Sequence, residues 1–192
     1  MNSYQRSTIP EGTSIGQNVV LGARVYIGRN CTIGHNVVIH DDTILEDSIR
    51  IDDNSVIGKR PMLAARSATT SSEELSGTTI GAGTTIGSCT VIYRGAKIGA
   101  KVLVADQASV RENVTIGEET IIGRGAYIEN KSSVGARCKI EANAYITAFS
   151  VIGNDCFIAP GVLTSNDTVS YTHLRAHETK ANIVCRLLLE KK

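Results

Sequence analysis

An aliphatic residue recurs at every sixth position along most of this chain. The repeat runs from Ile9 to Ile57 and again from Ile80 to Ile158, and all 23 of its positions are Ile, Leu or Val. Ala, Ser, Thr, Cys or Val lies two residues earlier in 22 of these hexads, and Gly follows the aliphatic residue in 12 of them. A period of six matches neither an isolated helix nor a flat strand. It predicts a coil of short strands joined by tight corners.

Each hexad of such a coil points one aliphatic and one small side chain into a narrow interior. We expect the glycines to supply corner dihedrals that strain other residues. Equivalent positions then stack at about 4.8 Å, and each coil is stabilised by its neighbours. Cys31, Cys138 and Cys156 occupy the small interior position, where Cys packs as a small apolar residue. Cys89 lies elsewhere in its hexad, and the sequence predicts no partner for it.

The hexad pattern, an aliphatic residue followed by Gly and preceded by a small residue, resembles that of the transferase hexapeptide family over about residues 7–164. This resemblance implies an all-β fold, a left-handed parallel β-helix with three hexads in each coil and about 7–8 coils in a single domain over residues 1–168. The left hand comes from the resemblance alone, because parallel crossovers are otherwise overwhelmingly right-handed.

One interruption breaks the repeat. The two hexad positions Ile57 and Ile80 lie 23 residues apart instead of six, which predicts a loop excursion at about 58–79. The segment is polar and carries Lys59, Arg60 and Arg66. Long loops in compact repeat proteins are often functional. We expect these three cations to bind substrate or a neighbouring subunit, and a solvated excursion without a ligand is the alternative.

The last residues, 169–192, do not continue the repeat. The stretches Val169–Thr179 and Val184–Lys192 resemble the two ends of a translated sequencing adapter. We therefore interpret this tail as non-native and the natural domain as cut short after about residue 168. A helix that caps the coil is the alternative interpretation of the same residues.

The family resemblance also implies an activity. Hexapeptide enzymes usually transfer an acyl group from acetyl-CoA or another acyl-CoA to an amine or hydroxyl, require no metal for it, and work as homotrimers with active sites between subunits. The prediction is a cytoplasmic bacterial N-acetyltransferase that acts on an amino sugar or sugar nucleotide in cell-envelope polysaccharide synthesis. With the natural domain interpreted as cut short, we expect the coils that complete the CoA groove in relatives to be absent, and an inactive fragment is the alternative.

The sharpest local resemblance lies at the end of the repeat. Residues 159–167, Ala-Pro-Gly-Val-Leu-Thr-Ser-Asn-Asp, are similar to the segment with a Thr-Asn-Asp core in sugar-nucleotide N-acetyltransferases, with Ser165 in place of the Thr. The resemblance implies that Asn166 and Asp167 are catalytic, orienting the acceptor amine or accepting its proton, and that Ser165 binds substrate. An Asn-Asp corner turn without a catalytic role is the alternative.

Two histidines offer a different general base. His35 and His40 lie in the early segment IGHNVVIH, and related acyltransferases, including the lipid A N-acyltransferases, use a corner histidine for this purpose. Both are roughly seven coils from Asn166, too far to serve the same acceptor. They are the weaker catalytic candidates, and a solvated corner histidine is the alternative.

Other functions compete with the main prediction. A UDP-3-O-acyl-glucosamine N-acyltransferase or a tetrahydrodipicolinate N-acetyltransferase fits the same family, and a non-catalytic β-helix scaffold is a different class. A hexapeptide carbonic anhydrase needs three histidine ligands on its metal, which the two early histidines do not provide. The net charge of +1 without a basic stripe disfavours nucleic-acid binding, and no apolar run is long enough to span a membrane.

Overall fold

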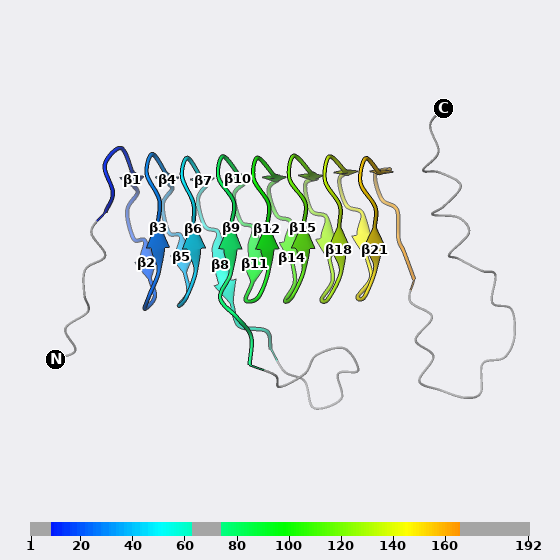
Figure 1. Ribbon diagram of the computed structural model, residues 1–192, viewed down its shortest axis with the longest axis horizontal. Coiled ribbons are helices and arrows are strands. Elements are labelled where there is room, and N and C mark those ends of the chain that lie inside the picture. The colour runs from blue at the N-terminus through cyan, green and yellow to red at the C-terminus, as the bar shows by residue number, and fades with distance from the viewer. Residues whose placement is uncertain (1–8, 63–73, 166–192) are drawn as a thin grey trace, which may run out of the picture.

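The computed structural model describes residues 9–62 and 74–165, and these form one straight three-sided prism without a helix (Figure 1). The chain winds round the prism and adds one strand to each of three parallel sheets in every turn. The turns number about seven, and the fold is a left-handed parallel β-helix. The predicted family fold is therefore confirmed.

The strands of the described residues are short, most of them only two residues. Sheet A contains β1 (Ser14–Ile15), β4 (Thr32–Ile33), β7 (Arg50–Ile51), β10 (Thr85–Ile86), β13 (Leu103–Val104), β16 (Ile121–Ile122), β19 (Lys139–Ile140) and β22 (Phe157–Ile158). Sheet B contains β2 (Val20–Leu21), β5 (Val38–Ile39), β8 (Val56–Lys59), β11 (Val91–Tyr93), β14 (Ser109–Val110), β17 (Tyr127–Ile128) and β20 (Tyr145–Ile146). Sheet C contains β3 (Tyr26–Ile27), β6 (Ile44–Leu45), β9 (Thr79–Ile80), β12 (Lys97–Ile98), β15 (Thr115–Ile116), β18 (Ser133–Val134) and β21 (Val151–Ile152).

The interior of the prism is the hexad column that the sequence predicts. In-register pairing places each aliphatic residue on its equivalent one turn away, as where Ile122 lies between Val104 and Ile140. Most of these side chains are fully buried, and the small residues two positions earlier are buried beside them. Cys31, Cys138 and Cys156 belong to this buried set, whereas Cys89 is exposed.

The glycines have a different role from the one expected. Gly16, for example, does not adopt a positive φ; a Cβ there would lie 2.6 Å from the backbone of Gly34 in the next turn. The positive φ falls two residues later, and the residue there is usually not Gly, as with Asn18 and Asn36. The expectation that these glycines supply corner dihedrals was therefore wrong for all of them except Gly58, whose φ is 77°, because it is mainly the close approach of successive turns that requires them.

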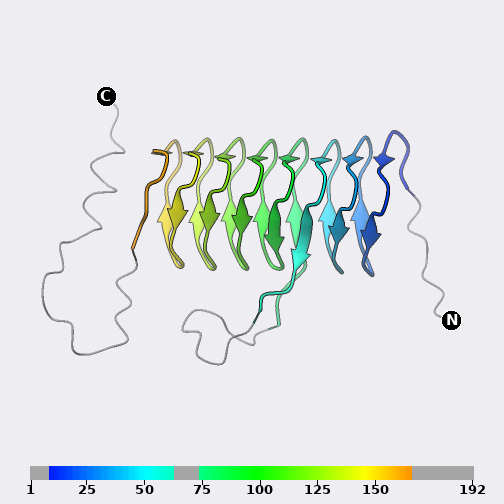
Figure 2. The same cartoon turned by 180° about the vertical axis from the view of Figure 1, so that it is seen from behind.

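The loop excursion leaves the prism between sheets B and C. Strand β8 runs on to Lys59, two residues beyond the usual strand end, and the chain rejoins the prism before β9. Figure 2 shows this departure from the far side, at the corner where the cyan and green segments meet. The register between β8 and β11 shifts at the same point, so that Tyr93 pairs with Lys59.

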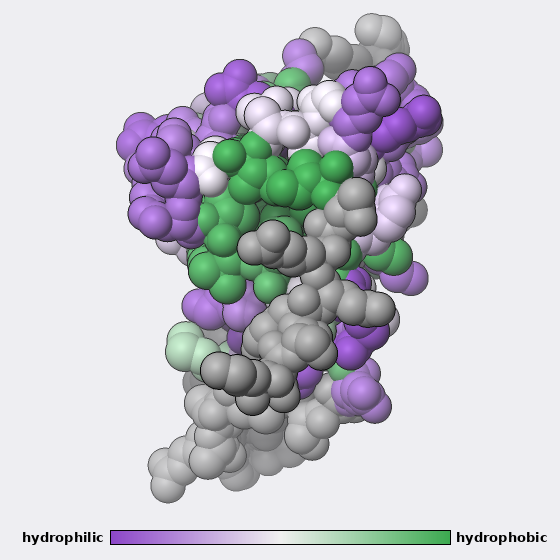
Figure 3. Space-filling model, turned by 90° about the vertical axis from the view of Figure 1, so that its left-hand side faces the viewer, coloured by the Kyte–Doolittle hydropathy of each residue, from purple (hydrophilic) through white to green (hydrophobic). Residues whose placement is uncertain are grey.

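The first turn of the prism leaves its interior column open at one end. Ile15 and Leu21 are only partly buried, and Ile9 is 53% exposed. Figure 3 looks onto this end and shows apolar side chains gathered there. A turn is completely buried only when another turn lies on each side of it.

Candidate functional site

The corner between sheets B and C differs from the other two corners of the prism. We call it the B–C edge and define it by its corner segments 22–25, 40–43, 93–96, 111–114, 129–132 and 147–150. After the second turn most of its hexads lack the glycine, and four successive turns bury polar side chains there. Their exposed fractions are 8%, 4%, 1% and 9% for Arg94, Glu112, Asn130 and Thr147. Buried polar groups of this kind need partners within the protein.

Arg94 ties the base of the loop to the prism. Its Nε donates to the carbonyl oxygen of Leu75 at 2.9 Å, and one terminal nitrogen donates to the carbonyl oxygen of Asp41 at 2.7 Å. The other terminal nitrogen donates to the Asp42 carboxylate at 2.6 Å. The guanidinium thus joins the returning end of the loop to the corner one turn before the loop leaves.

Asp42 completes this anchor from the other side. It accepts from Arg24 of the preceding turn as well as from Arg94. Hydrogen bonds from Arg24 and then Arg94 lower the pKa of the Asp42 carboxyl to about 2. The carboxylate is therefore ionised throughout the neutral range, and the anchor keeps its charge there.

A second group of charges lies beside the anchor. The Arg111 guanidinium lies 4.9 Å from the centroid of the Tyr93 ring, and the Lys59 ammonium lies 5.4 Å from it. Arg111 also pairs with Glu112 at 2.9 Å and with Glu129 of the next turn at 3.4 Å. Cations held against an aromatic face are attracted by its ring electrons.

The group continues into sheet B through Glu129 and Tyr145. Burial, together with the charge and hydrogen bond of Glu129, raises the pKa of the Tyr145 hydroxyl. The Tyr145 ring lies 6.3 Å from the ring of Tyr127 on the outer face of the same sheet. Positive charge, carboxylates and aromatic rings therefore line three successive turns of one edge.

The structure separates the two histidine candidates. His35 lies on the corner between sheets A and B, and its Nδ1 accepts from the backbone N–H of Gln17 at 2.9 Å. This bond ties the His35 ring to the preceding turn of the A–B corner, away from the B–C edge. His40 lies on the B–C edge instead, where its β-carbon is close to Gly58 at the start of the loop.

The cationic candidates divide between described and undescribed residues. Lys59 is half-buried against Tyr93, and Arg60 is exposed at the start of the loop. Both lie at the B–C edge, as His40 does. Arg66 lies outside the described residues.

Ser165 is exposed and follows the isolated bridge between Leu163 and Tyr145, which places it on the next turn of the same edge. It lies five turns from Lys59 and six from His40, or about 24 and 29 Å at the spacing of parallel strands. The sequence analysis put both histidines roughly seven coils from Asn166. The six turns between His40 and Ser165 are a similar separation. Asn166 and Asp167 lie outside the described residues.

The residues that the sequence prediction missed are Tyr93, Arg94, Arg111, Glu112 and Glu129. The sequence did contain a signal for them. At this corner, from Ile39 onward, the residue that follows the aliphatic position of each hexad is not Gly, with Gly58 as the one exception. Larger residues, most of them polar, occupy these positions instead of the glycine that the close approach of successive turns requires at equivalent positions elsewhere.

Two classes of feature are absent from the described parts of the chain. Residues 9–62 and 74–165 contain no group of three or more His, Cys, Asp or Glu side chains that could hold a metal ion. The same residues form no helix long and apolar enough to cross a membrane.

A prism of hexads with a polar edge defines a hexapeptide-repeat β-helix protein. Family models agree: bacterial transferase hexapeptide repeats match residues 6–41, and the hexapeptide repeat of succinyl-transferase matches residues 24–59. The chain belongs to the family of the GMPPB C-terminal domain, whose model matches residues 75–184, more than half of the chain. The predicted membership of the hexapeptide-repeat transferases is thereby confirmed.

Solved structures of similar fold include three bacterial acyltransferases. The UDP-N-acetylglucosamine acyltransferase of Francisella novicida is 19% identical with a TM-score of 0.40, over 74% of this chain and 58% of that one. The O-acyltransferase of Moraxella catarrhalis is 18% identical with a TM-score of 0.43, over 74% and 65%. A GDP-perosamine N-acetyl transferase variant from Caulobacter crescentus, in complex with CoA and GDP-perosamine, is 15% identical with a TM-score of 0.44, over 78% and 53%.

The chain thus spans between about half and two thirds of the length of these three proteins. No curated protein matches the chain.

Proposed function

We propose that this protein is an acyl-CoA-dependent N-acyltransferase that acylates the amino group of a sugar or sugar nucleotide, with acetyl-CoA as the expected donor. The observation that carries the proposal is the B–C edge itself. Among the three corners of the described prism, only this edge combines the base of the long loop, the cluster of Tyr93, Arg111 and Glu129, and Ser165, which precedes Asn166 and Asp167 in the sequence.

In the proposed acyl transfer, the two ends of the B–C edge have different roles. The acceptor amine attacks the thioester carbonyl, the carbon–sulfur bond breaks, and CoA leaves as the thiol while the amine loses a proton. Asn166 orients the amine and Asp167 accepts that proton, with Ser165 as a further hydrogen-bonding group. Lys59, Arg60 and Arg66 contact phosphate groups, because nucleotide and CoA substrates carry them and a cation binds them favourably.

A homotrimer completes the site in this proposal. The outward column of sheet B carries no charged residue on its eight turns, with aliphatic residues on five and tyrosine on two, whereas sheets A and C place Arg50, Lys139 and Lys97 on theirs. The residues of the sheet B column are Val20, Val38, Val56, Val91, Ser109, Tyr127, Tyr145 and Leu163. A flat apolar face of this kind is suited to pack against another copy of the chain, and the cleft beside it then includes the B–C edge.

The direct test is release of free thiol from acetyl-CoA by the whole chain in the presence of a panel of amino-sugar nucleotides. We expect thiol release that depends on one acceptor, together with an N-acetylated product found by mass spectrometry. Acceptors whose amine is replaced by a hydroxyl serve as the matched control. A protein that binds neither substrate and releases no thiol with any acceptor is the result expected of a β-helix scaffold, and it would overturn the proposal.

A further inference from the structure

Two of the interior cysteines are direct neighbours. Cys138 and Cys156 occupy the same position on consecutive turns, at the corner between sheets C and A. The strands that follow them, β19 and β22, pair in register, with Lys139 opposite Phe157. Cys138 is fully buried and Cys156 is 7% exposed. Equivalent α-carbons on paired strands are about 4.8 Å apart, within the 4.4–6.8 Å range that disulfides span.

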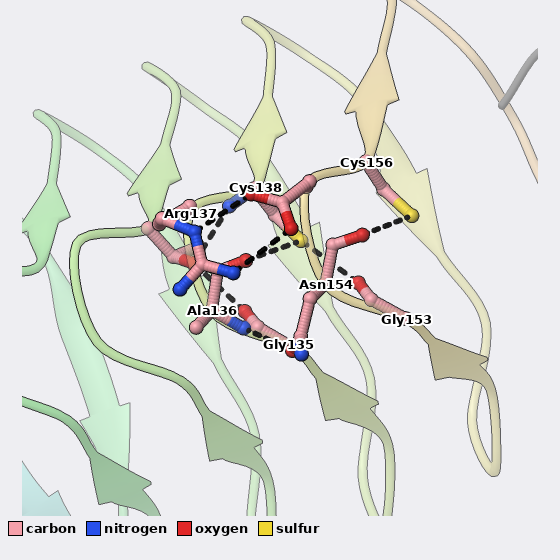
Figure 4. Close-up of polar contacts among 9 residues, drawn as sticks. Gly135, Ala136, Arg137, Cys138, Gly153, Asn154 and Cys156 are labelled. Carbon is pink, nitrogen blue, oxygen red and sulfur yellow. Dashed lines mark hydrogen bonds and ion pairs between the residues drawn. The ribbon is translucent and has the colours of Figure 1, made fainter. Parts of the chain in front are cut away.

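Several bonds hold these two turns in fixed register, as Figure 4 shows. The backbone N–H of Lys139 donates to the Cys156 carbonyl oxygen at 2.8 Å, and that of Ala136 donates to the Asn154 side-chain oxygen at 2.8 Å. The Arg137 guanidinium makes two bonds to the Asp155 carboxylate, at 2.7 and 2.8 Å. Because the backbone is already ordered on both sides, linking the two side chains requires little further ordering.

The thiols themselves have weak partners. The Cys138 thiol donates to the carbonyl oxygen of Gly153 at 3.0 Å, and the Cys156 thiol donates to that of Asn154 at 3.5 Å. Burial raises the pKa of the Cys156 thiol, and the adjacent Cys138 thiol adds to the rise. Thiol–disulfide exchange proceeds through the thiolate, so a reaction of this pair is expected to quicken as the pH rises.

We propose that Cys138 and Cys156 form a modification site, a dithiol that a low-molecular-weight disulfide converts into an intramolecular disulfide. One thiolate attacks the small disulfide and releases the first small thiol. The second thiolate then attacks the mixed disulfide and releases the other. Two cysteine thiols are oxidised, one small disulfide is reduced to two thiols, and these take up the two protons.

Such a bond would fasten two neighbouring turns on the C–A corner, away from the B–C edge. In a fold where each turn is stabilised by the next, a covalent link between turns opposes fraying of that end. The inference does not depend on the proposed acyl transfer, because neither cysteine contacts that edge.

The test uses the whole chain with Cys89→Ser and Cys185→Ser, which leaves Cys31, Cys138 and Cys156. Incubation with oxidised glutathione at pH about 8.5 is expected to leave one titratable thiol and to lower the mass by about 2 Da. The melting temperature should rise by about 5–10 °C and return after reduction. Cys31 is the internal control, because Thr13 lies beside it in the preceding turn and Ile49 in the following one.

The matched variant adds Cys138→Ser, which removes one partner and keeps a small polar residue. Oxidised glutathione should then give a stable mixed disulfide on Cys156 or no reaction, without a rise in the melting temperature. Three titratable thiols in the parent protein after oxidation, or a mixed disulfide that never resolves, would overturn the proposal. A linked pair that melts at the unlinked temperature would refute the stabilising effect.

Discussion

Replacing Ile122 with Ala should lower the free energy of unfolding by about 2–5 kcal/mol, as truncation of large buried aliphatic residues does. Ile122 is fully buried in the middle of the prism and lies between Val104 and Ile140. The cavity weakens contacts to both neighbouring turns at once, and a narrow interior leaves few side chains able to move into it. Urea unfolding followed by circular dichroism measures the change.

The adjacent Ile121 provides the matched control. It belongs to the same two-residue strand, but its side chain points to the outer face of sheet A, where it lies between Leu103 and Lys139. Ile121→Ala should cost less than about 1 kcal/mol, since its side chain already contacts water. Equal losses for the two variants would contradict the assignment of inward and outward positions.

The second large effect concerns the acceptor end of the proposed site. We expect Asp167→Asn to lower kcat in the thiol-release assay by about 10²–10³-fold, because the amide cannot take the amine proton that the carboxylate accepts. Asn166→Ala should raise KM for the acceptor as well as lower kcat, since an orienting bond is lost.

Asp155→Asn is the control for this experiment. Asp155 is an exposed carboxylate on the C–A corner, where Arg137 lowers its pKa. Its loss should leave kcat within about twofold of the parent, since surface substitutions away from a site usually have small effects. Full activity in Asp167→Asn combined with its loss in His40→Ala would reject Asp167 as the base and assign that role to His40 instead.

The fold could be predicted from the sequence because the repeat is simple. Each hexad follows the same packing rule, so each of the 23 aliphatic positions is a separate indication of the same fold. The role of the glycines could not be derived in this way. Gly16 and Asn18 are both corner residues, and only the three-dimensional structure shows that Gly16 approaches the next turn closely while Asn18 adopts the positive φ.

The candidate site was harder to predict, since it depends on which residues the winding brings together. Tyr93 and Lys59 lie 34 positions apart in the chain and pair because the chain rejoins the prism after the loop and places β11 beside β8 in sheet B. Arg94 and Asp42 are separated by 52 residues and form the anchor for the same reason. A residue-by-residue search for catalytic motifs finds histidines and the Asn-Asp pair, but it does not assign residues to one of three edges.

The central claim is that one edge of the prism binds the substrates. Titration of the isotope-labelled protein with CoA, followed by the shifts of its backbone amide resonances, tests it most directly. We predict that the largest shifts fall in corner segments 93–96, 111–114, 129–132 and 147–150, while segments 105–108 and 123–126 of the A–B corner and 99–102 and 117–120 of the C–A corner change little. Equal shifts on all three corners, or shifts confined to another corner, would contradict the claim.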